Sequence, residues 1–245
     1  MLGLGHAIYT AIPTFDDEEM LIILGDTIFD VNLDGVFDKK ISSLGVKEVD
    51  DPRRFGVAII KNGIVKKVVE KPKEPVSKLA LVGLYYIANK NSLTDSLNEL
   101  IEKDIRTKGE LQLTDALQIM IDKGEEMRTF PVDGWYDCGK PETVLSTNQF
   151  LLTRNGTNRE LENVLINHPV FIAENAVVKN SIIGPFTTIA ENCEIIDSNI
   201  KNSIINSGAK VKMALLENSI VGSNAMIIGN FKKFNTGDSS EVEFY

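Results

Sequence analysis

The chain has 245 residues, enough for one large domain or two ordinary domains with buried cores. Hydrophobic residues make up 43% and charged residues 25%, values typical of a globular protein in water. The net charge of -9 argues against binding to the phosphate backbone of nucleic acid, because such binding needs clustered Lys and Arg.

The two cysteines, Cys138 and Cys193, are far apart in the sequence and form no Cys-x-x-Cys pair. This spacing disfavours a disulfide scaffold or a zinc site and favours a reducing compartment. No apolar run is long enough to span a bilayer, and the first residues do not show a basic segment followed by a long apolar one. We therefore expect a cytoplasmic protein that binds neither membranes nor nucleic acid.

The first 150 residues alternate between strand and helix patterns. Residues 20–24 form a continuous apolar run, the pattern of a strand covered on both faces. Further strands are predicted over 56–60, 64–69 and 81–87, and amphipathic helices over 91–101 and 113–121. Strands mixed with amphipathic helices predict an α/β sheet that is parallel at its centre.

From about Val164 the sequence repeats every six residues, with an aliphatic residue first and a small residue fifth in each unit. The clearest units begin at Ile183, Ile189, Ile205 and Val221. This six-residue period is typical of a parallel β-helix, in which each unit forms one flat side of a triangular coil. A β-sandwich with short strands is the alternative, but it predicts no fixed six-residue spacing.

A polar segment over 153–163, which contains the turn pattern Arg154-Asn155-Gly156, separates the two patterns. We therefore expect an α/β domain over 1–153, a β-helix over 164–231 and a C-terminal tail over 232–245.

Two aspartates follow predicted strands and have glycine close by. Asp26 follows Gly25 just beyond the 20–24 strand, where ligands bind in open α/β sheets, and glycine permits close approach. Asp137 lies two residues before Gly139, ahead of a helix that enters at Pro141. Capping or turn aspartates give the same local pattern. If the sheet brings the two carboxylates together, they can share one Mg²⁺.

Two further motifs contain groups that could bind a phosphorylated sugar or a nucleotide. In Val69-Glu70-Lys71-Pro72, Lys supplies a point charge for phosphate and Glu accepts hydrogen bonds from sugar hydroxyls, although charged turns before proline are usually only solvated. Gly3-Leu4-Gly5-His6-Ala7 opens a helical stretch, where free backbone N–H groups suit an anion or a base edge. A histidine in that place is more often a helix-start residue. The acids of segment 109–115 suit the N-terminus of the helix that follows.

Taken in order, these motifs resemble the sugar-1-phosphate nucleotidyltransferase family, above all the long-form glucose-1-phosphate thymidylyltransferases and their uridylyl relatives. The resemblance covers nearly the whole chain and rests on segments 3–7, 24–26, 51–58, 69–72, 82–85, 109–115 and 135–139. The repeat region, with Gly237-Asp238-Ser239-Ser240 near its end, is similar to the long form. The resemblance implies an α/β, Rossmann-like (GT-A-like) nucleotidyltransferase domain followed by a left-handed parallel β-helix of hexapeptide repeats.

The resemblance also implies roles for the matching residues. Asp26 and Asp137 would bind Mg²⁺ and, with Lys71, would be catalytic. The substrate-binding residues would be Gly56, Val82 and Gly83 in the sugar pocket, Glu70 and Lys71 at the sugar hydroxyls and phosphate, and Gly3, Gly5 and His6 at the nucleobase. A sugar 1-phosphate would attack the α-phosphorus of dTTP or UTP and release pyrophosphate, a reaction that depends mainly on positioning and charge neutralisation.

One segment of the family pattern is not found in this sequence: the Gly-x-Gly-Thr-Arg-Leu loop that cradles the triphosphate. We therefore expect an N-terminally truncated domain that is weakly active or inactive by itself. The expected partners are a nucleoside triphosphate, a sugar 1-phosphate, a second copy of the chain and, for a split enzyme, a separate chain that supplies the loop. A non-catalytic scaffold homologue is the alternative. An acyltransferase β-helix would need a catalytic histidine, and only His168, before the first clear coil, is available.

Overall fold

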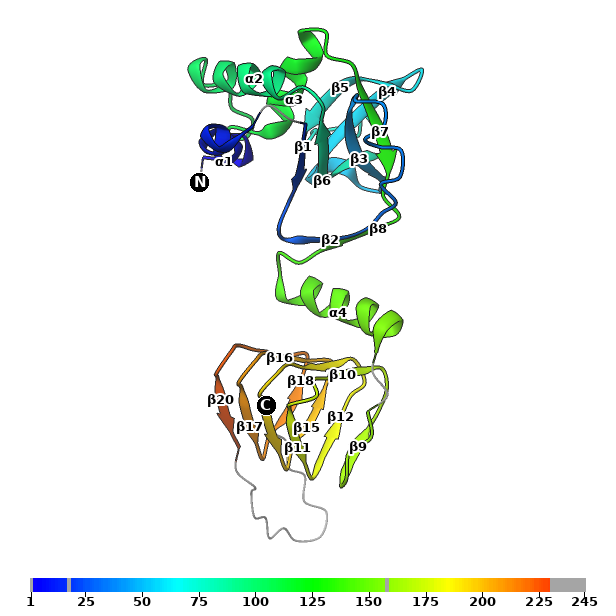
Figure 1. Cartoon of the computed structure of the whole chain (residues 1–245), viewed down its shortest axis with the longest axis vertical. Helices are drawn as coiled ribbons and strands as arrows, with labels where there is room; N and C mark the ends of the chain where they lie inside the picture. The colour runs from blue at the N-terminus through cyan, green and yellow to red at the C-terminus, as the bar shows by residue number, and fades with distance from the viewer. Residues whose placement is uncertain (1, 17–18, 157–158, 230–245) are drawn as a thin grey trace. The chain divides into compact units, whose positions relative to one another are not determined.

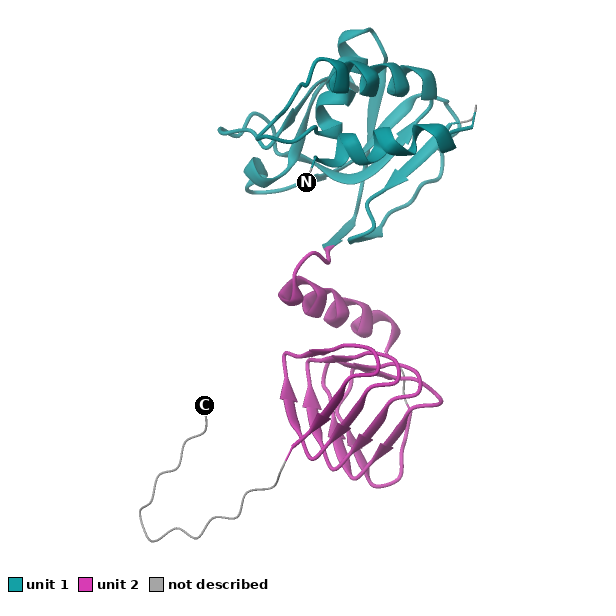
Figure 2. Ribbon diagram, turned by 90° about the vertical axis from the view of Figure 1, so that its left-hand side faces the viewer, with its two compact units in different colours: residues 1–136 teal, residues 137–245 magenta. Residues whose placement is uncertain are grey.

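The structure, a computed structural model, describes residues 2–16, 19–156 and 159–229. The chain divides into two compact units, residues 1–136 and 137–245 (Figure 2). The helix over 141–155 belongs to the second unit, whereas the sequence places a domain boundary after residue 153. The predicted domain limits stay a prediction, and the predicted tail over 232–245, including 237–240, lies outside the described residues. In the described ranges, no helix is long and apolar enough to cross a membrane.

Unit 1 contains a twisted sheet with helices packed against one of its faces (Figure 1). Its elements are α1 (Leu4–Ala11), a 3-10 turn (Ile12–Thr14), β1 (Met20–Ile23), β2 (Thr27–Asp30), β3 (Ser42–Glu48), a second 3-10 turn (Pro52–Arg54), β4 (Gly56–Lys61), β5 (Ile64–Glu70), β6 (Leu79–Ile87), α2 (Lys90–Glu102), α3 (Leu113–Asp122), β7 (Met127–Pro131) and β8 (Gly134–Asp137).

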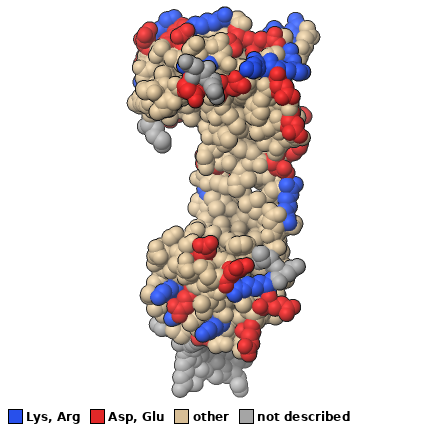
Figure 3. Space-filling model, viewed as in Figure 1, with Lys and Arg blue, Asp and Glu red and all other residues tan. Residues whose placement is uncertain are grey.

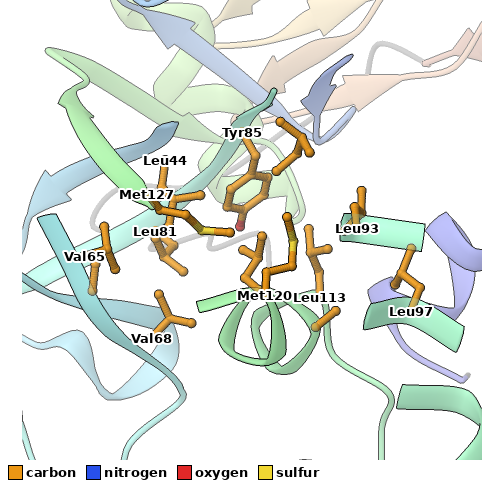
Figure 4. Packing of buried hydrophobic residues seen from close by; sticks show 14 of the residues in the cluster. Leu44, Val65, Val68, Leu81, Tyr85, Leu93, Leu97, Leu113, Met120 and Met127 are labelled. Atoms are coloured by element: carbon orange, nitrogen blue, oxygen red, sulfur yellow. The ribbon is translucent and has the colours of Figure 1, made fainter. Parts of the chain in front are cut away.

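Helices α2 and α3 confirm the amphipathic pattern predicted over 91–101 and 113–121. The side chains of Leu93 and Leu97 in α2, and of Leu117 and Met120 in α3, are fully buried. Figure 4 shows these helices packed against side chains from β3, β5, β6 and β7. The α2 helix begins where the Asn89 side chain accepts a hydrogen bond from the Ser92 N–H at 3.1 Å.

The prediction of a parallel sheet centre is wrong. The strand order is β5-β4-β6-β3-β7, and β6 pairs antiparallel with β3 on one edge and with β4 and β1 on the other. The one parallel pair in this described sheet is β3 with β7. The β4–β5 hairpin turns at Asn62-Gly63, both with positive φ, which is a tight-turn signal already present in the sequence.

Strand β1 is not covered on both faces, as its apolar run had predicted. Its outward side chains, Leu21 and Ile23, are 38% and 55% exposed, whereas Met20 and Ile22 pack against the core. Beyond the strand, the Leu24 N–H donates to the Gly83 carbonyl at 3.0 Å. A continuous apolar run therefore identifies a strand, but it does not establish that both of its faces are covered.

Unit 2 begins with α4 (Pro141–Asn155) and continues as a parallel β-solenoid of about four turns (Figure 1). Three parallel sheets form its sides: β10-β13-β16-β19, β11-β14-β17-β20 and β18-β15-β12-β9. The strands are β9 (Val164–Ile166), β10 (Val170–Ile172), β11 (Val177–Lys179), β12 (Ser181–Ile183), β13 (Thr187–Ile189), β14 (Glu194–Ile196), β15 (Asn199–Lys201), β16 (Ile204–Ile205), β17 (Lys210–Lys212), β18 (Leu215–Glu217), β19 (Ile220–Val221) and β20 (Met226–Ile228). This architecture confirms the predicted β-helix.

Aliphatic side chains at the six-residue positions fill the solenoid. Ile183, Ile189 and Ile195 are fully buried. The recurrent asparagines of the repeat stand at corners: Asn202 and Asn218 both have positive φ, and the Asn202 amide donates to the Asn218 side-chain oxygen at 2.6 Å. Asparagine tolerates the left-handed conformation better than most residues, which explains its recurrence. On the face that Figure 3 shows, basic and acidic side chains are interspersed on both units.

A pair of neighbouring isoleucines tests the inward and outward alternation. Ile183→Ala, at a fully buried position, is expected to destabilise the solenoid by about 2–5 kcal/mol. Ile182→Ala, at a 39% exposed position on the same strand, should cost less than about 1 kcal/mol. Far-UV circular dichroism during heating would follow the solenoid, and fluorescence of the single tryptophan, Trp135, would follow unit 1. Equal losses for the two variants would contradict the assigned alternation.

Candidate functional site

The end of β5 holds an acid and a base in contact. The Glu70 side chain is 9% exposed, and its Oε1 lies 3.5 Å from Lys71 Nζ. Lys71 has a φ of 41°, a left-handed conformation that costs a non-glycine residue about 1–3 kcal/mol. Its N–H donates to the Phe55 carbonyl at 3.0 Å, which holds the backbone in this conformation. The sequence motif is therefore a constrained pair rather than a solvated turn.

Gly56 lies opposite Glu70 in the β4–β5 pair. A Cβ at this position would lie 3.0 Å from Glu70 Oε2 and 3.0 Å from Thr114 Oγ1. Any side chain there would therefore crowd the carboxylate. Of the residues expected on the sugar side, the structure thus brings Gly56, Glu70 and Lys71 together.

Val82 and Gly83 lie on β6, in a different environment. Val82 is buried in a cluster that includes Phe130 and Trp135, and a Cβ on Gly83 would lie 2.5 Å from Leu24 Cδ1. Trp135 links this cluster to the Glu70-Lys71 pair, because its ring packs edge-on against Phe55, with the ring centroids 4.7 Å apart. The expected contact of Val82 and Gly83 with the sugar stays a prediction.

The two aspartates expected to bind metal are exposed, Asp26 in a turn and Asp137 at the end of a strand. Asp26 follows β1 in unit 1, and Asp137 ends β8 as the first residue of unit 2. Asp137 Oδ1 accepts a hydrogen bond from the Gly139 N–H at 2.9 Å, which leaves further lone pairs for a ligand. Mg²⁺ takes one or two carboxylates together with substrate phosphates, and its expected binding by these two aspartates stays a prediction. Among the described residues, no group of three or more His, Cys, Asp or Glu could hold a metal by itself.

The glycines before α1 pack against the segment that leads into α3. Gly3 has a φ of 97°, and a Cβ there would lie 2.5 Å from the Leu111 carbonyl oxygen. The Gly5 N–H donates to that same oxygen at 2.9 Å, so it is not free for an anion, contrary to the sequence expectation. The ring of His6, which is half-buried, lies 6.3 Å from that of Tyr9. The role of these residues at a nucleobase stays a prediction.

The segment over 109–115, whose acids were expected only to suit a helix N-terminus, contains two residues that interact with Glu70. Thr114 Oγ1 donates to Glu70 Oε2 at 2.7 Å. Burial raises the pKa of Asp115, a hydrogen bond from Thr107 opposes that rise, and the charge of Glu70 adds to it. Asp115 Oδ2 is buried without a hydrogen-bond partner. The available signal was the placement of polar residues at the start of an otherwise apolar helix.

The ionised form of Asp115 is expected to cost stability. Because burial raises its pKa in the folded state, the fold favours the protonated acid, and stability falls as pH rises from the unfolded pKa through the folded one. Asp115→Asn, which cannot ionise, should gain stability relative to the wild type across that window. Urea unfolding followed by Trp135 fluorescence at several pH values would measure this gain. The control is Asp95→Asn at an exposed position on α2; a gain for Asp115→Asn that does not change with pH would contradict the assignment.

Comparisons with known proteins agree with this architecture. A family model described as nucleotidyl transferase matches residues 1–154. A glucose-1-phosphate thymidylyltransferase from Streptomyces antibioticus is 28% identical over 99% of this chain and 76% of its own length. The bifunctional protein GlmU of Methanocaldococcus jannaschii is 34% identical over 91% of this chain and 59% of its own length. A crystal structure of apo UDP-glucose pyrophosphorylase is 26% identical, with a TM-score of 0.53 over 63% of this chain and 62% of that chain.

The chain thus spans about three fifths of the GlmU relative and of the solved pyrophosphorylase. The family model covers the whole of unit 1, including the Glu70-Lys71 pair and Asp26, and extends through Asp137 into α4. The chain belongs to the nucleotidyl transferase family.

Proposed function

We propose that this chain serves the transfer of a nucleotidyl group from dTTP or UTP to a sugar 1-phosphate, glucose 1-phosphate in the first place, with release of pyrophosphate. The observation that carries the proposal is the constrained Glu70-Lys71 pair beside Gly56. Glu70 can accept hydrogen bonds from sugar hydroxyls, and Lys71 can neutralise a phosphate group. Gly56 has no side chain and therefore leaves space beside Glu70. A sugar 1-phosphate needs these two kinds of contact.

The backbone around the pair supports this assignment. Left-handed backbone at a non-glycine residue tends to occur where the surrounding structure enforces it, and such residues cluster at ligand sites. The strain at Lys71 is held by the Phe55 carbonyl, which in turn belongs to a residue packed on Trp135. The backbone from which the Lys71 side chain extends is therefore fixed, so less backbone freedom is lost when phosphate binds.

In the proposed reaction a phosphate oxygen of the sugar 1-phosphate forms a bond to the α-phosphorus of the triphosphate. The bond between the α-phosphorus and the bridging oxygen breaks, and pyrophosphate leaves with that oxygen and its electron pair. Lys71 would hold the sugar phosphate and offset its negative charge as it approaches a second anion. Glu70 would orient the sugar ring through a hydroxyl. When bound by Asp26 and Asp137, Mg²⁺ would neutralise phosphate charge.

The names of relatives support testing both pyrimidine nucleotides. The Streptomyces relative is named a thymidylyltransferase, and the solved structure is a UDP-glucose pyrophosphorylase. Both names include glucose and a pyrimidine nucleotide, and they differ in the nucleobase. We therefore propose glucose 1-phosphate as the common substrate and leave dTTP and UTP as two arms of the assay.

Binding of glucose 1-phosphate tests the sugar side directly. Isothermal titration calorimetry of the whole chain should show binding, and Lys71→Met should weaken it at least about tenfold, because a charge-assisted contact to phosphate is lost. The matched control is Lys66→Met, at an exposed lysine on β5, which should bind as the wild type does. The proposal fails if the wild type does not bind or if the two variants bind equally.

Pyrophosphate release tests the transfer step. With dTTP or UTP and glucose 1-phosphate, release should require Mg²⁺, stop when the metal is chelated, and fall at least about 100-fold in Asp137→Asn. Asp133→Asn, at an exposed position four residues earlier, is the control. A slow but metal-dependent rate is sufficient to support the proposal. Sugar phosphate binding with no release at all would instead favour the non-catalytic scaffold homologue.

A further inference from the structure

Two polar side chains on one face of α3 make hydrogen bonds to β5. Gln118 Oε1 accepts from the Val68 N–H at 2.8 Å, and Thr114 Oγ1 donates to Glu70 Oε2 at 2.7 Å. Four residues of helix rise about 6 Å, and two residues of strand span about 6.6 Å. The two contacts are therefore in register, and the helix and strand are matched along their common length.

Gln118 provides the hydrogen-bond partner for a backbone N–H of β5. Strand β5 is the terminal strand in the sheet order, so the Val68 N–H, which points away from β4, has no strand to pair with there among the described residues. Val68 is buried, and an unpaired N–H there would destabilise the fold. The other end of the Gln118 amide donates to Asp122 Oδ1 at 2.7 Å, which fixes the orientation of the amide. The side chain thus anchors α3 to β5 two residues before Glu70.

Thr114 then determines how Glu70 presents its carboxylate. With Oε2 occupied by the hydroxyl, Oε1 is the oxygen that faces Lys71 Nζ. Gly56 leaves the space beside Oε2 just large enough for this hydrogen bond, because a Cβ would lie 3.0 Å from both of its atoms. The carboxylate is thus held through Oε2 by the Thr114 hydroxyl, and its Oε1 is turned toward the Lys71 ammonium group.

We propose that Thr114 and Gln118 are positioning residues that hold Glu70 so that its Oε1 accepts one hydroxyl of the sugar 1-phosphate, and that they thereby select sugars that keep this hydroxyl. The inference rests on the proposed function, because it takes Glu70 as the sugar contact. The Glu70 side chain is 9% exposed, so a sugar without the hydroxyl would leave Oε1 without the hydrogen bond that this hydroxyl donates. Sites that hydrogen-bond a substrate hydroxyl reject analogues that lack it strongly.

The test is a cycle between protein variants and monodeoxy sugars. Wild-type chain, Thr114→Val and Thr114→Ser are titrated with glucose 1-phosphate and with its 2-, 3-, 4- and 6-deoxy analogues. One analogue should bind the wild type at least about tenfold more weakly than glucose 1-phosphate. Thr114→Val should weaken glucose 1-phosphate about five- to tenfold, yet weaken that analogue less than about twofold, because the interaction is already absent. Thr114→Ser, which keeps the hydroxyl, should restore the wild-type pattern.

Further variants separate positioning from stability. Gln118→Met should give the same selective loss, and Thr153→Val, which removes a hydroxyl bonded to a backbone carbonyl on α4, should leave every titration unchanged. If Thr114→Val does not fold, as judged by circular dichroism, Thr114→Ala takes its place. A uniform loss for all sugars, or no loss, would overturn the positioning role while the proposed function stands. Failure of the wild type to bind glucose 1-phosphate would overturn both.

Discussion

The packing of α3 against β5 is the interaction on which the candidate site depends. Leu117 and Met120 bury their side chains in the core that also contains Val65 and Val68 of β5. Burial of each such side chain contributes about 1.5–3 kcal/mol and fixes the distance between helix and strand, but it is non-directional and leaves sliding along the axis poorly determined. The hydrogen bonds of Thr114 and Gln118 supply the missing direction. Apolar contacts therefore set how close the two elements lie, and polar contacts set their register.

The same segment also connects the sugar side of the site to the glycines before α1. The Leu111 carbonyl accepts the Gly5 N–H, and its own N–H donates to the Leu2 carbonyl, three residues before Thr114 contacts Glu70. A shift of α3 would therefore displace both the Leu111–Gly5 contact and the Thr114–Glu70 contact. The half-buried Asp115, which is hydrogen-bonded to Thr107, adds a cost in the same turn, because burial and the charge of Glu70 both disfavour its ionised form. Such a cost is tolerated where a polar arrangement serves binding rather than stability.

The sequence predicted the elements that depend on a local period, and it predicted pairing and exposure less well. The repeat of Ile183, Ile189 and their equivalents identifies the solenoid because each coil buries its own aliphatic residue against the next. Helices α2 and α3 follow from their spacing for the same reason. Strand direction in the sheet depends instead on partners far along the chain. The Asn62-Gly63 turn is the local signal that indicates an antiparallel pair, the β4–β5 hairpin. Glu70 and Lys71 could be found from charge and position, whereas the contact of Thr114 with Glu70 could not, since the two residues are 44 apart in the sequence.

Lys71 shows how the fold converts a sequence motif into a binding geometry. A proline follows it, and proline disfavours the right-handed helical conformation in the residue before it. The extended conformation would continue β5, so the left-handed turn at φ 41° must be maintained by the Phe55 carbonyl and by the buried Pro72. In this conformation the chain leaves the sheet directly after Glu70, and the ammonium group returns to 3.5 Å from its carboxylate. Because the Lys71 side chain is 38% exposed, solvent screens the ion pair, which contributes about 1 kcal/mol or less and does not offset the backbone strain. The strain is thus better explained by the phosphate and sugar ligands proposed for this pair than by the stability of the free protein.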